Sequence, residues 1–103
     1  MGVNIYRALS VRVKTVEQLE DIRREYLEKI NRADRKKLEE LFEFFAWKAF
    51  EEDRLRSILE RFIKTFPKGK VPKRYVEVKA MRDRLYLLWS GLRDEVAKRL
   101  GVV

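Results

Sequence analysis

The thirty residues from Val71 to Leu100 are dominated by an apolar row at helical spacing. Its members lie three or four residues apart: Val78, Met81, Leu85, Leu88, Leu92 and Val96. Residues at this spacing share one face of an α-helix, and a helix with such a face is stable only when that face is buried. The pattern predicts a C-terminal helix over residues 72–100 whose apolar face is the spine of the core, packed against the rest of the chain.

A second row runs along the same predicted helix. Its members are Tyr75, Lys79, Arg82, Tyr86, Trp89 and Arg93. At about 100° per residue this row lies roughly 90–100° round from the apolar one. It combines aromatic rings with positive charges, so we interpret it as a surface for a partner that is both anionic and flat. We call it the basic–aromatic row.

Positive charge is concentrated next to this row. The chain has a net charge of +8, and residues 64–84 hold eight basic and two acidic side chains. This segment therefore contributes +6 and the rest of the chain only +2. Its centre is a loop, predicted over residues 67–72, in which Pro67 stops one helix, Gly69 supplies the turn and Pro72 is the first residue of the next helix. Such a concentration favours a polyanionic partner.

The composition excludes several classes of function. There is no cysteine and no histidine, which excludes disulfides, thiolate metal sites, histidine triads and haem ligation by imidazole. We expect no catalytic residue, no metal and no cofactor. Charged residues make up 41% of the chain, which is typical of a thermophile. No apolar run approaches the roughly 18–20 residues that span a bilayer, and the N-terminus does not resemble a signal peptide, so we expect a cytoplasmic protein.

Residues 3–14 show apolar residues at alternating positions. Val3, Ile5, Leu9, Val11 and Val13 are all odd-numbered, a pattern typical of a half-buried β-strand. A helix starting at Asn4 is the alternative, and we favour the strand. No other segment reads clearly as a strand, so pairing across a homodimer would satisfy its backbone groups.

Residues 15–66 read as a helical hairpin. Thr15 and Gln18 form a capping box at its start, and Asn31 ends the first helix and caps the next. Nothing forbids a single helix from Ala33 to Phe66, because this stretch contains neither glycine nor proline. Its apolar face nevertheless turns by roughly 80–90° near residues 51–53. We favour a break or kink there over one continuous helix.

An aromatic row at Phe44, Trp47 and Phe50 lies apart from the main apolar face of this segment. A helix that is apolar on two sides is either buried between neighbours or offers one side to a partner. These three residues are our candidate partner interface.

The sequence therefore predicts one mainly α domain over residues 1–103, a small bundle of three to four helices with one short N-terminal strand. The first functional hypothesis is a non-enzymatic protein that binds nucleic acid, with single-stranded DNA or RNA favoured, through basic residues on phosphates and Tyr or Trp rings on bases. Its candidate contacts are Lys68, Lys70, Lys73, Arg74, Tyr75, Lys79, Arg82, Tyr86, Trp89 and Arg93. The alternative is a helical interaction subunit of a larger assembly, with a nucleoprotein assembly as one option.

Overall fold

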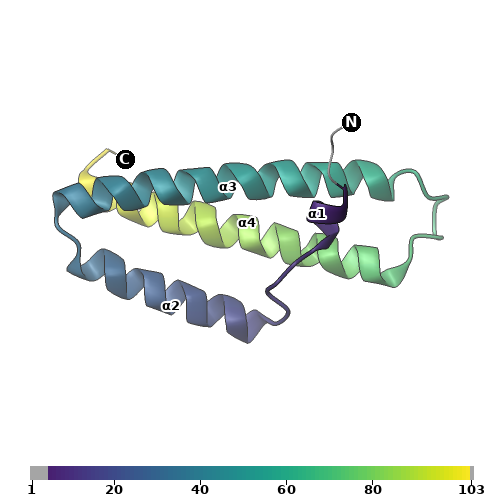
Figure 1. The fold of residues 1–103 in the computed structure, drawn as a ribbon, viewed down its shortest axis with the longest axis horizontal. Coiled ribbons are helices and arrows are strands. Elements are labelled where there is room, and N and C mark those ends of the chain that lie inside the picture. The colour runs from purple at the N-terminus through teal and green to yellow at the C-terminus, as the bar shows by residue number, and fades with distance from the viewer. Residues whose placement is uncertain (1–4, 103) are drawn as a thin grey trace.

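The structure, a computed structural model, describes residues 5–102, and in this range it forms four α-helices and no strand (Figure 1). They are α1 (Ile5–Leu9), α2 (Val16–Arg32), α3 (Arg35–Ile63) and α4 (Lys73–Leu100). The two long helices, α3 and α4, form an antiparallel hairpin, and α2 packs beside α4. The short α1 lies against the C-terminal half of α3. The predicted helical bundle is confirmed.

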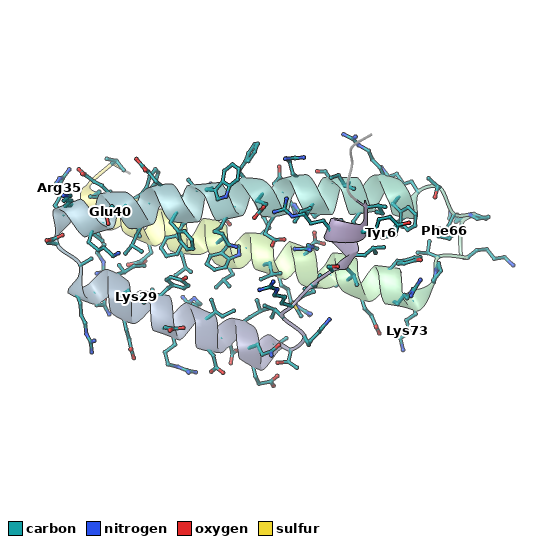
Figure 2. The ribbon with its side chains drawn as sticks, in the orientation of Figure 1. Tyr6, Lys29, Arg35, Glu40, Phe66 and Lys73 are labelled. Carbon is teal, nitrogen blue, oxygen red and sulfur yellow. The ribbon has the colours of Figure 1, made fainter. Side chains whose placement is uncertain are left out.

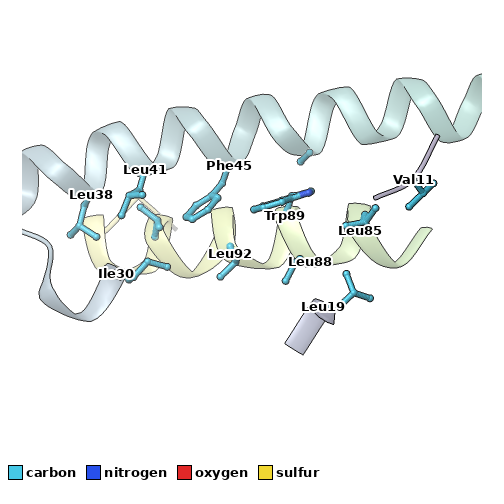
Figure 3. Packing of buried hydrophobic residues seen from close by; sticks show 12 residues of the cluster. Val11, Leu19, Ile30, Leu38, Leu41, Phe45, Leu85, Leu88, Trp89 and Leu92 are labelled. Carbon is cyan, nitrogen blue, oxygen red and sulfur yellow. The ribbon is translucent and has the colours of Figure 1, made fainter. Parts of the chain in front are cut away.

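The core lies between the hairpin helices and α2 (Figure 3). Phe45 of α3 is fully buried and its ring stacks on that of Trp89 from α4, with centroids 6.1 Å apart. Tyr26 of α2 meets the Phe45 ring edge-on at 5.2 Å, and Ile30 of α2 is 1% exposed. Helix α2 is therefore held by its own apolar face, as its periodicity predicts.

Local capping signals agree with the structure at most helix ends. The Thr15 hydroxyl accepts the amide of Gln18 at 3.1 Å, while Gln18 accepts the Thr15 amide at 3.1 Å, so the predicted capping box is confirmed. Gly101 ends α4 in the left-handed conformation with φ of 77°, as expected for a helix C-terminus. The cap of α3 is Asp34, whose carboxylate accepts the Lys37 amide at 2.8 Å, and the expectation that Asn31 caps this helix is wrong.

The predicted N-terminal strand is wrong over the described residues 5–14; residues 3 and 4 lie outside the described range. Ile5, Ala8 and Leu9 have the i, i+3, i+4 spacing of one helical face, and this face packs against Leu55 and Leu59 of α3. A strand would need a neighbour to pair with, and no other strand occurs in residues 5–102. The helix instead forms hydrogen bonds within its own turns, its last carbonyls accept from Arg82, and Ala8 is completely buried.

The predicted break at residues 51–53 is also wrong, because α3 continues through them without interruption. Its apolar face turns because the helix changes neighbours along its length. The first half packs into the cluster shared with α2 and α4, whereas Leu55 and Leu59 belong to a second cluster with Ala8 of α1. A change of packing partner thus produces the same sequence pattern as a change of helix direction.

The connection between α3 and α4 begins earlier than predicted, since α3 ends at Ile63. A turn follows in which the Lys70 amide donates to the Pro67 carbonyl at 2.9 Å, with Gly69 at φ of 80°. Pro72 is the residue that caps α4 and not, as predicted, its first helical residue. Its carbonyl accepts the Tyr75 amide at 3.0 Å.

We predict that Phe45→Ala lowers the free energy of unfolding by about 3–5 kcal/mol, because it removes a fully buried ring from the centre of the bundle. Phe50→Ala is the matched control on the same helix, since Phe50 is 57% exposed and its loss should cost less than about 1 kcal/mol. Urea unfolding followed by circular dichroism at low protein concentration measures both. Equal effects of the two substitutions would contradict the assignment of this core.

Candidate functional site

The basic–aromatic row does not form one surface in the folded protein. Trp89 is 7% exposed and belongs to the core, where its ring lies between α3 and α4 (Figure 3). Arg82 is 5% exposed. The structure therefore does not support these two residues as nucleic-acid contacts, because neither presents a face to solvent.

Arg82 instead joins three parts of the chain. Its Nη1 donates to both carboxylate oxygens of Glu52 on α3, at 3.0 and 2.9 Å. Its Nε donates to the Ala8 carbonyl at 3.0 Å, and its Nη2 donates to the carbonyls of Arg7 and Ser10 at 2.9 and 2.7 Å. The Arg7 and Ala8 carbonyls belong to the last turn of α1, where a helix leaves carbonyls without their usual partners, and the Ser10 carbonyl lies just beyond it. All three guanidinium nitrogens are thus engaged, and Arg82 has a structural role.

Lys79 and Tyr86 lie at the seam between α3 and α4 and are engaged by neighbours. The Lys79 ammonium is 2.9 Å from the Asp83 carboxylate. The Arg56 guanidinium lies 4.1 Å from the centre of the Tyr86 ring. Burial acts to lower the pKa of Arg56, but its hydrogen bonds and charge interactions with Asp53 and Asp83 outweigh this and raise the pKa above its ordinary value. The Tyr86 ring is therefore covered by a permanent cation.

The other predicted cations are exposed at the end of the hairpin. Between Glu60 and Glu77 the chain contains no acidic residue. Six exposed basic residues lie in this interval. We call the five nearest the loop the basic end: Lys64, Lys68, Lys70, Lys73 and Arg74. Among residues 5–102 two acids form weak ion pairs with them, with Lys64 3.9 Å from Glu60 and Lys73 3.9 Å from Glu77. Arg93, by contrast, lies half-buried on α4 beside Asp94 at 3.2 Å.

An open hollow of about 460 Å³ adjoins the basic end. It is lined by Ile5, Tyr6, Leu9, Phe62, Arg74, Tyr75 and Val78. The Tyr75 ring packs edge-on against Phe62 at 5.1 Å, and Arg74 donates to the Tyr75 hydroxyl at 2.8 Å. Tyr6 is 80% exposed, and Figure 2 shows it on the side of the hairpin toward the loop. The hollow therefore combines aromatic and apolar walls with a cationic rim.

Sequence reasoning missed Tyr6 as part of this site. The available signal was that Tyr6 interrupts the apolar alternation of residues 3–14, where a large aromatic ring falls on the face predicted to be polar. Phe62 packs against the cluster that includes Ala8 of α1 and also lines the hollow. Only the placement of α1 against α3 brings Tyr6 beside Tyr75.

The predicted partner row divides into two parts. Trp47 and Phe50 are 58% and 57% exposed on α3, with ring centres 6.0 Å apart. Phe44 is 39% exposed and its ring lies 5.9 Å from Tyr26 and 6.1 Å from Trp89, at the edge of the core. Trp47 and Phe50 therefore form the exposed apolar surface, and Phe44 contributes to packing.

Comparisons with protein-family models, curated proteins and solved structures give no match for this chain. Within residues 5–102 no helix combines the length and apolar character needed to cross a membrane. The same residues contain no group of three or more acidic side chains placed to hold a metal ion. The assignment of a function therefore depends on the two surfaces just described.

We predict that Arg82→Met destabilises the fold by about 3–5 kcal/mol, because it leaves the buried Glu52 carboxylate and the α1 carbonyls without their donor. The double variant Arg82→Met/Glu52→Met should recover a large part of this loss. Lys79→Met is the control, since it breaks a more exposed pair on the same helix and should cost at most about 1 kcal/mol. Thermal and urea unfolding measure all three, and an Arg82→Met effect no larger than that of Lys79→Met would contradict the structural role.

Proposed function

We propose that the protein is a non-enzymatic, single-stranded nucleic-acid-binding protein that uses the basic end and the adjoining hollow. Lys68, Lys70, Lys73 and Arg74 contact the phosphates of the strand. The rings of Tyr6 and Tyr75 contact its bases. A strand with unstacked bases offers both an anionic backbone and flat apolar faces, which are the two features that this surface complements.

The observation that carries the proposal is the position of the cations next to the aromatic hollow. The interval from residue 61 to residue 76 holds six basic and no acidic residues, and Tyr75 lies within it. Stacking of a base on an exposed aromatic ring contributes about 1–3 kcal/mol, and each phosphate contact adds a salt-dependent increment. A duplex would use the cations but leave the hollow empty, so the surface favours single strands.

The contact set differs from the one that the sequence predicts. Arg82 and Trp89 are excluded from it by burial. Lys79 and Tyr86 lie further along α4 and do not line the hollow, so we assign them no primary contact. They are engaged with Asp83 and Arg56. Tyr6 replaces Trp89 as a stacking group.

A second candidate function is supported by a separate observation. Trp47 and Phe50 on α3 expose more than half of their surface. An exposed aromatic pair of this kind is typical of a protein–protein contact. The protein would then act as a helical interaction subunit of a larger assembly, and the two candidates use different surfaces.

We predict that Lys68→Gln/Lys70→Gln/Lys73→Gln weakens binding of a labelled single strand at least about tenfold at low salt. It should also reduce the slope of log affinity against log salt by about 2, since each lost phosphate contact to a single strand removes about 0.7. Fluorescence anisotropy with single-stranded DNA, single-stranded RNA and duplex, each titrated at several salt concentrations, measures both quantities.

The matched control is Lys36→Gln/Lys37→Gln/Lys98→Gln, which removes the same charge from exposed positions at the opposite end of the hairpin. This variant should bind strands nearly as the unaltered protein does. Equal weakening by the two triple variants would show that strand binding depends on net charge and not on the position of the lysines. Absence of strand binding by the unaltered protein at moderate salt would refute the proposed function.

We further predict that Tyr6→Leu weakens single-strand binding about fivefold to a hundredfold while leaving the salt slope unchanged, because it removes a stacking ring and no charge. Tyr6 is 80% exposed, so the fold should tolerate the change. Tyr86→Leu is the control at a ring covered by Arg56 and should leave strand affinity within about twofold. A salt-slope change with Tyr6→Leu, or equal losses for both variants, would contradict the role given to the hollow.

A further inference from the structure

The outer face of α3 carries side chains at a regular spacing, all exposed except Ser57, which is half-buried. Glu40, Glu43, Trp47, Phe50, Arg54 and Ser57 are separated by three, four, three, four and three residues. This spacing places them along one stripe of the helix, as in the seam of a coiled coil. We call this stripe the outer face, and it lies away from the buried side of α3 that carries Phe45, Ala49 and Leu59.

The centre of the outer face is apolar and its two ends carry opposite charge. Trp47 and Phe50 form the exposed centre, with 58% and 57% of their surface open to solvent. Glu43 precedes them and Arg54 follows them. Neither charged residue forms an ion pair with any side chain in residues 5–102. Trp47 and Phe50 therefore have apolar surface available for burial, and Glu43 and Arg54 have no ion-pair partner within residues 5–102.

We propose that the occupant of this face is a second copy of the same chain, with the two α3 helices packed antiparallel about a two-fold axis. The axis passes between Trp47 and Phe50, so that Trp47 packs on Phe50 of the partner subunit. The same register places Glu43 opposite Arg54 of the partner subunit, and Glu40 opposite Ser57 of the partner subunit. Because a two-fold contact is reciprocal, each pair occurs twice.

The distribution of charge decides the orientation. In a parallel pair Glu43 would face Glu43 of the partner subunit, and Arg54 would face Arg54 of the partner subunit, which repel. In the antiparallel pair each Glu43 instead faces Arg54 of the partner subunit, and these opposite charges attract. The complementarity ends beyond Glu40 and Ser57, because Lys36 would approach Arg61 of the partner subunit. The interface is therefore short, and we expect a dissociation constant in the micromolar range.

This inference gives the second candidate function a specific partner and does not depend on nucleic-acid binding. The basic end lies outside the outer face, so dimerisation leaves it open. At 1.5 Å per residue, the two basic ends of such a dimer would lie about 45 Å apart or more, at opposite ends of the assembly.

Sedimentation equilibrium from about 1 to 300 μM tests the proposal, since this range brackets a micromolar dissociation constant. The unaltered protein should dimerise. Glu43→Arg should weaken the dimer at least tenfold by placing two arginines opposite each other, and Arg54→Glu should do the same with two glutamates. The double variant Glu43→Arg/Arg54→Glu should recover dimerisation to within about threefold, because the pair is restored with reversed polarity.

Mixing the two single variants should produce a heterodimer, since each then supplies the charge that the other lacks. Trp47→Ala should abolish the dimer, and Lys36→Gln should leave it intact. Circular dichroism confirms that every variant retains its helices. A monomeric unaltered protein, a dimer insensitive to Glu43→Arg, or a double variant that fails to recover would each overturn the proposal, whatever the result of the strand-binding titration.

Discussion

The buried pair of Arg82 and Glu52 is the interaction that connects the helical hairpin to the N-terminal segment. It joins α4 to α3, and the Arg82 guanidinium also donates hydrogen bonds to three backbone carbonyls at and just beyond the end of α1. A buried guanidinium is stable only when its donors are satisfied, so the N-terminal segment and the hairpin depend on one another. The hollow depends on this connection, because α1 supplies its Ile5, Tyr6 and Leu9 walls.

The two candidate surfaces are separated along the hairpin. The basic end lies at the loop, where helix termini and a turn hold five cations in solvent. The outer face lies near the middle of α3, where Trp47 and Phe50 are exposed. A nucleic-acid strand bound at the basic end and a second subunit bound at the outer face would not compete for the same residues. This arrangement allows the protein to be both a strand-binding protein and a dimer.

Much of the fold follows from short-range patterns. The Thr15–Gln18 capping box, the turn at Gly69 and the end of α4 at Gly101 each depend on residues close in sequence, and each was predicted correctly. The strand over residues 3–14 and the break near residue 52 were not. Both predictions depended on apolar patterns that have more than one structural cause. Alternating apolar residues also occur in a short helix, and the apolar face of a continuous helix also turns where the helix packs against a new neighbour.

For the site, the sequence by itself determined that positive charge gathers between residues 61 and 76, since no acid occurs there to neutralise it. Only the tertiary structure decided which neighbouring groups stay accessible. Arg82 and Trp89 share a helical row with Tyr75, yet burial of more than nine-tenths of their surface removes them from any interface. Tyr6 is far from Tyr75 in sequence and lines the same hollow. Helical spacing gives the direction of a side chain, whereas the neighbouring helices decide whether solvent or protein lies in that direction.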